Sequence, residues 1–206
     1  RIAGDFQRTA TAEAASASLR SLSGEVHAAA AAATFDTLDL SRRALSSRFD
    51  ELSGGHGGAG GWTRSLGGAG SSVAGGQGQV DGWMIGQDAR LGGGTVAGMA
   101  FGESRGNSRL QGVADRSRER QTQAQAYLGT QGAHAYVMGQ FGVGQWQRQI
   151  DRDLLLGASR YGVHSDYDGR FMVASVEGGY RFDAGAATLV PYVGAEHAQV
   201  DSDGFR

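Results

Sequence analysis

The sequence predicts an all-β membrane barrel, antiparallel and up-and-down, with an N-terminal α-helix that threads the pore. Three observations predict this fold. Long segments alternate apolar with polar residues, the second face of these segments is rich in glycine and other small residues, and short turns alternate with longer polar segments. A barrel with an apolar outside and a roomy polar inside accounts for all three.

Composition narrows the class of protein before any motif is considered. The 206 residues include 36 glycines, one proline and no cysteine, and 19 basic against 21 acidic side chains give a net charge of -2. This charge argues against nucleic-acid binding, and the lack of cysteine excludes disulfides and thiolate metal sites. The apolar run from Ala28 to Ala33 is far shorter than the roughly 20 residues of a membrane-spanning helix. Because the chain starts at Arg1 without methionine, we interpret it as a piece of a longer precursor.

Residues 1–52 are expected to form a linker and pore-helix region. Helix-favouring residues predict stretches at about 11–22 and 25–51, with an interruption near Thr34 as an open alternative. Apolar residues of the second stretch recur at steps of three, four and seven, and they are Phe35, Leu38, Leu45, Phe49 and Leu52. Three arginines fall largely off this stripe, and Asp39 can pair with Arg43 one turn on. The result is a long, arginine-bearing helix.

Residues 53–206 are expected to form a partial transmembrane barrel. A Gly/Ser/Ala-rich connection at 53–78 holds one short strand, and the period then changes to two. The seven expected strands lie near 60–68, 79–91, 94–106, 117–130, 133–148, 169–183 and 186–203. They exceed the five or six residues typical of globular proteins and suit tilted membrane-spanning strands of about nine to eleven residues.

The alternation assigns two faces to each strand. At 117–130 the apolar face carries Thr122, Ala124, Ala126 and Leu128, and the polar face carries Gln121, Gln123, Gln125 and Tyr127. At 169–183 the apolar face carries Met172, Ala174, Val176, Tyr180 and Phe182, and the other carries Ser175, Glu177, Gly179 and Arg181. The same division holds at 94–106 and 133–148. A soluble sandwich also permits such a pattern, but its solvent face would not favour glycine, which weakens strands.

Turns and loops follow the same plan. Tight turns are expected at 90–93, 129–132 and 182–185, while the segments 106–117 and 148–169 are longer and charged, and are expected to be loops. Outer-membrane barrels alternate short periplasmic turns with longer external loops in this way.

Several motifs together resemble the translocator domain of autotransporters. They are Ser21-Leu22-Ser23-Gly24-Glu25-Val26-His27-Ala28, Gly61-Trp62-Thr63-Arg64, Tyr180-Arg181-Phe182, Pro191-Tyr192-Val193-Gly194 and Asp201-Ser202-Asp203-Gly204-Phe205. The resemblance runs from about residue 18 to 206 and is closest to domains that follow subtilisin-like or esterase passengers. It implies a barrel of roughly twelve strands that helps export an upstream passenger in type V secretion. With seven strands, the chain is expected to be an incomplete barrel. Asn107 is the only asparagine and lies outside the helix, so self-cleavage by a helix asparagine is not expected.

The resemblance also implies partners and a location. The partners are outer-membrane lipid, a passenger in cis and the barrel-assembly machinery, and the location is the bacterial outer membrane. Nucleic acid is not expected as a partner, on the ground of the net charge. The alternative is a soluble or surface β-domain with a helical stalk that acts as an adhesion or binding module. Detergent dependence separates the two, because a chain with several lipid-facing strands does not stay monomeric in plain buffer.

The candidate site is the contact between helix and pore lining. Glu177 and Arg181 fall on the expected inner face, where Glu177 can meet a helix arginine. The residues expected to line the pore or seat the helix are Arg42, Arg43, Arg48, Gln123, Gln125, Glu177 and Arg181. Exposed ion pairs contribute little, so solvated charges are the competing interpretation.

No enzymatic site, cofactor or metal is expected. Gly102-Glu103-Ser104-Arg105-Gly106 matches a nucleophile elbow, but no helix pattern follows it. Gly55, Gly57 and Gly60 match a dinucleotide fingerprint, yet a helix precedes them where a strand is required. The five histidines show no pair at helical ligand spacing. An active site in the segments 106–117 or 148–169 remains the third hypothesis.

Overall fold

The structure is a computed structural model of the chain and describes residues 25–69, 76–110, 115–156, 159–185 and 187–203, together with Ser16 and Leu19. Its helix α3 (Glu25–Ser53) is followed by β1 (Gly61–Ala69), β2 (Gly76–Gly92), β3 (Thr95–Leu110), β4 (Arg116–Gln131), β5 (Ala135–Leu156), β6 (Ser159–Tyr180), β7 (Phe182–Ala184), β8 (Ala187–Leu189) and β9 (Tyr192–Ser202). Apart from Ser16 and Leu19, the helical stretch expected at 11–22 lies outside the described residues. α3 runs through Thr34 without a break, so the alternative of an interruption there was wrong.

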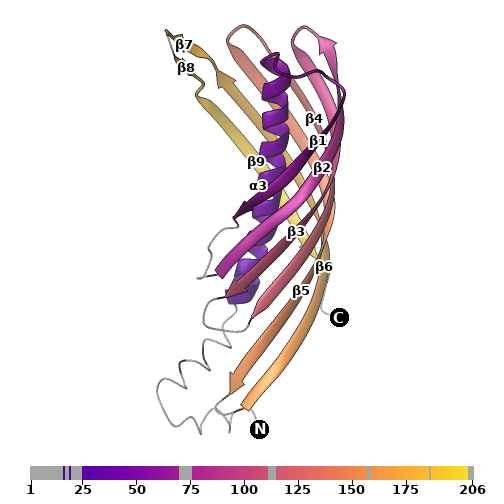
Figure 1. The fold of residues 1–206 in the computed structure, drawn as a ribbon, viewed down its shortest axis with the longest axis vertical. Helices are drawn as coiled ribbons and strands as arrows, with labels where there is room; N and C mark the ends of the chain where they lie inside the picture. The colour runs from indigo at the N-terminus through magenta and orange to yellow at the C-terminus, as the bar shows by residue number, and fades with distance from the viewer. Residues whose placement is uncertain are drawn as a thin grey trace.

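The sheet is antiparallel and up-and-down, in the order β1-β2-β3-β4-β5-β6-β9. Each strand pairs with the next along the chain, except that the small β7–β8 hairpin stands between β6 and β9. The strands lie side by side in one curved sheet, and α3 runs along its concave side (Figure 1). The fold is thus an antiparallel barrel-type sheet with a helix on its inside, and among the described residues the sheet is open between β1 and β9.

The two charged segments expected to be loops are mostly strand. β3 continues to Leu110 and β4 begins at Arg116, while β5 and β6 stay paired from Ala135↔Tyr180 to Leu156↔Ser159. The expectation of long loops at 106–117 and 148–169 was therefore wrong for their described residues. Strand pairing needs only backbone hydrogen bonds, so a polar segment can extend a ladder without an apolar face.

The segment expected as one strand at 186–203 is divided. β8 ends at Leu189 and β9 begins at Tyr192, with Pro191 between them. Proline has no N–H to give to a ladder, so it interrupts strands. The carbonyl of Pro191 still accepts a hydrogen bond from the Tyr180 N–H at 3.0 Å, which leads β9 onto β6.

The two faces of the sheet have opposite character. Along β4, every second residue from Ser117 to Gly129 is buried or nearly so, including the three glutamines, whereas the alternate residues are mostly exposed. Large apolar side chains cover the convex face and are exposed; they include Ile85, Met99, Phe101, Leu128, Val137, Phe141, Val143, Met172 and Val176. This is the reverse of a soluble sandwich, in which the apolar rows would be buried between layers.

Glycines on the concave side make room for large rings. A Cβ on Gly98 would lie 2.5 Å from the Tyr127 ring, and one on Gly144 would lie 2.3 Å from the Phe171 ring. At Gly129 the crowding ring belongs to the helix, since a Cβ there would lie 2.4 Å from Phe49. The glycine-rich inner face is therefore filled by aromatic side chains and by α3 itself.

α3 packs an apolar stripe against this face. Leu38, Leu45, Phe49 and Leu52 are buried, and the main cluster joins the last three to side chains of five strands: Leu66, Met84, Val96, Ala100, Tyr127 and Met138. Phe35, which the sequence placed on the same stripe, is 49% exposed and lies off the contact. Within the described residues, no helix combines the length and the hydropathy needed to cross a membrane.

Candidate functional site

A buried ion pair joins the C-terminal part of α3 to β2. Asp88 accepts hydrogen bonds from Arg48 Nε at 2.8 Å and Nη2 at 3.1 Å, from the Gly60 N–H at 2.8 Å and from the Tyr127 hydroxyl at 2.8 Å. The Asp88 side chain is 0% exposed and that of Arg48 is 9% exposed. Four hydrogen bonds satisfy the buried carboxylate, which is the condition under which a buried charge is tolerated.

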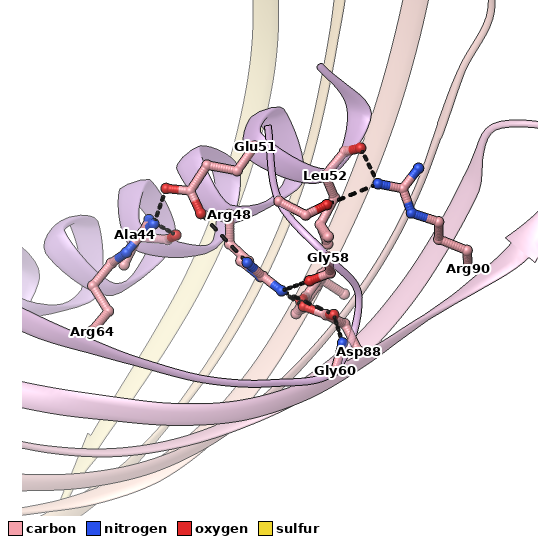
Figure 2. Close-up of polar contacts among 11 residues, drawn as sticks. Ala44, Arg48, Glu51, Leu52, Gly58, Gly60, Arg64, Asp88 and Arg90 are labelled. Carbon is pink, nitrogen blue, oxygen red and sulfur yellow. Dashed lines mark hydrogen bonds and ion pairs between the residues drawn. The ribbon is translucent and has the colours of Figure 1, made fainter. Parts of the chain in front are cut away.

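The C-terminal half of α3 is held by arginines from the sheet. Arg64 donates to the Ala44 carbonyl at 2.8 Å and pairs with Glu51, while Arg90 donates to the Leu52 carbonyl at 2.8 Å (Figure 2). Arg48 also donates to the Gly58 carbonyl at 2.8 Å. A helix leaves its last carbonyls without partners, and positive side chains at that end suit its dipole. The sheet thus caps the helix and fixes the chain that leads into β1.

A second polar cluster joins the N-terminal part of α3 to β4 and β5. Thr34 donates to Glu119 of β4 at 3.0 Å, and Arg148 of β5 donates to Glu119 at 2.8 Å and to the Thr34 hydroxyl at 2.6 Å. The Arg148 guanidinium also lies 4.7 Å from the centroid of the Trp146 ring, within the range of a cation–π contact. α3 is therefore anchored near both ends of its contact with the sheet.

Between these clusters the contact is made by neutral amides and hydroxyls. Gln123 donates to the Ser41 hydroxyl, and Gln125 donates to Gln123 at 2.9 Å. Gln140 of β5 donates to the Ser46 hydroxyl at 2.9 Å. The two glutamines expected on the inner face of β4 lie there, and one of them touches the helix.

The opposite side of α3 is more open. Arg42 lies 3.6 Å from Glu177 of β6 and 3.3 Å from Glu196 of β9, and it also pairs with Asp39 at 2.7 Å. Arg43 is 66% exposed and pairs with Asp39 one turn earlier, as the spacing indicates. Beside them is a hollow of about 710 Å³, whose lining includes Arg42, Asp50, His134, Glu177, Arg181 and Tyr192.

The seven expected residues thus divide into groups. Arg42 meets Glu177, whereas Arg48 meets Asp88, and Arg181 lines the hollow beside Glu177. The sequence did not indicate Asp88, Glu119 or Arg148. The only feature of the sequence that could have indicated them is a charged residue on the inner row of a strand. Asp88, for example, follows Met84 and Gly86 at a step of two, so it belongs to the same row.

The nucleophile-elbow motif has no catalytic geometry. Ser104 lies within β3 rather than on a strand-to-helix turn, its side chain is buried, and its hydroxyl has no hydrogen-bond partner among the described residues. An activated serine needs a base within hydrogen-bond reach. The same part of the chain contains no cluster of three metal-ligating side chains.

The comparisons agree with this architecture. The sequence profile described as "Autotransporter beta-domain" matches residues 57–206. Among solved structures, the translocator domain of autotransporter NalP from Neisseria meningitidis is similar with a TM-score of 0.60 and 17% sequence identity, covering 82% of this chain and 61% of that one. No match was found among curated protein sequences. The chain therefore spans less than two thirds of the NalP domain.

An antiparallel barrel-type sheet with an exposed apolar outside and a helix on its polar inside defines the class of outer-membrane β-domains. With the profile match over most of its length, the chain belongs to the autotransporter β-domain family, and its location is the bacterial outer membrane.

Proposed function

We propose that the chain exports and anchors a passenger attached upstream of α3, and that α3 then fills the pore. The observation that carries this proposal is the direction of the helix. Its C-terminal end lies beside Arg90 and Gly60, near the tight β2–β3 turn, whereas Thr34 lies beside Glu119, toward the long β5–β6 hairpin. Short turns are periplasmic in outer-membrane barrels. A segment upstream of α3 would therefore leave the pore on the external side.

The seating of the helix is part of the same proposal. Arg48 and Asp88, helped by Gln123, hold α3 against β2 and β4, while Arg42 and Glu177 hold its other side. Of the remaining expected residues, Arg43 and Arg181 line the hollow on the open side, and Gln125 supports Gln123. Outer-membrane lipid would cover the convex apolar rows, and the barrel-assembly machinery would insert the strands. The domain supplies no chemistry of its own, so Ser104→Ala is expected to change no hydrolase activity.

The test is surface display of the passenger by the full-length protein. Ala126 lies on the convex face in the middle of the apolar part of β4, where an arginine at the bilayer midplane costs about 2–4 kcal/mol. We expect Ala126→Arg to abolish or strongly reduce protease-accessible passenger on intact cells. Gln147→Arg is the matched control, because Gln147 lies on the same face but beyond the apolar rows, opposite Arg120 and Asp168.

Equal display by both variants would contradict a lipid-facing convex surface. The same result would favour the alternative of a soluble or surface-exposed adhesion module with a helical stalk.

A further inference from the structure

Beyond the apolar rows, the convex face of β3 and β4 carries a cluster of arginines. The residues are Arg105 and Arg109 of β3 and Arg116, Arg118 and Arg120 of β4. All five are exposed; the side chains of Arg105, Arg118 and Arg120 are 64%, 57% and 57% exposed. We call these five residues the arginine ladder.

The register places like charges directly opposite each other. Arg105 lies across from Arg120, and Arg109 lies across from Arg116. Like charges in directly opposed positions destabilise a sheet, so the arrangement favours binding of an anion between them. A groove of about 520 Å³ lies over this part of the sheet, and its lining includes Gln79, Asn107, Arg109, Arg116 and Arg118.

Carboxylates on the same face neutralise only part of the ladder. Glu103 accepts from Arg105 at 3.2 Å and from Arg120 at 2.8 Å, and Asp81 lies opposite Arg105 in the register. Asp151 lies opposite Arg116 but is 3.6 Å from Arg118 and hydrogen-bonded to His164 at 2.7 Å. That bond raises the pKa of His164, which lies on the external end of β6, so Asp151 is engaged elsewhere.

Among the described residues, two arginines of the ladder have no carboxylate within ion-pair distance. Neither Arg109 nor Arg116 forms an ion pair with another residue in the described part of the chain. Both line the groove. Guanidinium groups bind phosphate through two parallel hydrogen bonds. An arginine pair therefore suits a phosphate better than an anion that acts only as a point charge.

The height of the ladder determines what kind of anion reaches it. Along β4 the apolar part of the convex row runs from Thr122 to Thr130 through two alanines and Leu128. The segment 122–130 is nine residues long, which matches a tilted strand that crosses the hydrocarbon layer. Arg120 follows one step beyond Thr122 on the same row. The ladder is therefore continuous with the lipid-facing surface. Arg105 and Arg120 lie at the headgroup level, on the side away from the short turns, and Arg109 and Arg116 lie four residues farther out.

We propose that the arginine ladder binds the phosphate groups of a phosphorylated glycolipid in the outer leaflet. This inference rests on the proposed function, because it requires the convex rows to face lipid. The groove between β2 and β4 takes the phosphorylated headgroup, and the acyl chains lie along the apolar rows below it. The occupant is a membrane lipid rather than a soluble anion.

The test uses the full-length protein folded in detergent and incubated with bisphosphorylated lipid A or with its dephosphorylated form. Bound lipid is counted by native mass spectrometry after detergent exchange. We expect retention of the phosphorylated form only, and an affinity about 30-fold weaker in the double variant Arg109→Gln/Arg116→Gln. The double variant Arg109→Lys/Arg116→Lys should recover part of the affinity, because it keeps the charge but loses the planar fork.

Arg170→Gln is the control at the edge of the apolar rows, level in the register with Thr122. Arg170 is an exposed arginine on the convex face of β6, and its neighbours in the register are Gln145 and Asp201 rather than another arginine. Its loss should leave binding unchanged. Equal retention of both lipids, an equal loss in Arg170→Gln, or binding of inorganic phosphate without the lipid would overturn the inference. If the protein never forms a compact, heat-modifiable species, the proposed function is overturned as well. If it forms this species but shows no preference for the phosphorylated lipid, only this inference is overturned.

Discussion

The two sides of α3 are held by the same kinds of side chain in different surroundings. On the side of β2, the Arg48–Asp88 pair is shielded from solvent and each charge has several hydrogen bonds. On the side of β6 and β9, Arg42 is 29% exposed and shares its charge among three carboxylates at 2.7–3.6 Å. Buried pairs are costly to break and exposed pairs contribute little, so burial decides which contact fixes the helix.

The largest expected effect is the loss of the buried counter-charge. Asp88→Asn keeps the shape of the side chain but leaves the Arg48 charge without the carboxylate that accepts two of its hydrogen bonds. Removing one partner of a buried pair costs about 3–5 kcal/mol. We expect the full-length protein to lose its compact form on gels at a clearly lower temperature, and α3 to become accessible to protease.

A double variant tests the cause of this loss. Arg48→Met/Asp88→Leu removes both charges and should recover much of the thermal midpoint, because an apolar pair of similar volume can replace a buried ion pair. If the double variant is no more stable than Asp88→Asn, the lost packing and hydrogen bonds of Tyr127 and Gly60 account for the effect instead of the loss of the buried counter-charge of Arg48.

The second prediction concerns packing on the buried side. Gly129→Val places methyl groups where a Cβ already lies 2.4 Å from the Phe49 ring, so α3 has to shift away from β4. Overpacking of this kind costs about 1–3 kcal/mol. The thermal midpoint of the full-length protein should fall. Gly162→Val in β6 is the control, since a Cβ there meets no described atom within 4 Å and its midpoint should stay the same or rise.

The fold could be predicted from the sequence because strands between lipid and a polar interior alternate apolar and polar residues with a period of two. In β4 the alternation of glutamines with alanines and Leu128 was enough to assign both faces. Beyond Thr122 the convex row becomes polar, so the outer ends of β3, β5 and β6 and the first two residues of β4 lost the pattern and were mistaken for loops. The extent of a ladder depends on backbone pairing, which side-chain periodicity does not report.

The site was only partly predictable for a related reason. Arg42, Glu177 and the inner glutamines could be assigned from their faces alone. The pairing of Arg48 with Asp88 depends on the position of α3 along β2. The two residues are 40 positions apart in the sequence, and a glycine-rich connection lies between them. No local periodicity sets that position. The packing of Phe49 into the space left by Gly129 sets it, and this contact exists only in the folded sheet.

The smallest expected effect lies on the open side of the helix. Glu177→Gln removes one of the three carboxylates near Arg42, but Asp39 at 2.7 Å and Glu196 at 3.3 Å remain. The Tyr136 hydroxyl, which donates to Glu177 at 2.7 Å, can still donate to the amide oxygen of glutamine. Part-exposed pairs contribute about 0–1 kcal/mol, so the thermal midpoint of the compact form should move by a degree or two at most.

Salt dependence distinguishes this contact from the buried one. Added salt screens exposed charges more than buried ones, so the small difference between Glu177→Gln and the native protein should vanish at high ionic strength, while the deficit of Asp88→Asn should persist. A Glu177→Gln deficit as large as that of Asp88→Asn would show that the open side holds α3 equally firmly. The helix would then be fixed from two sides, and burial at β2 would not be what decides its position.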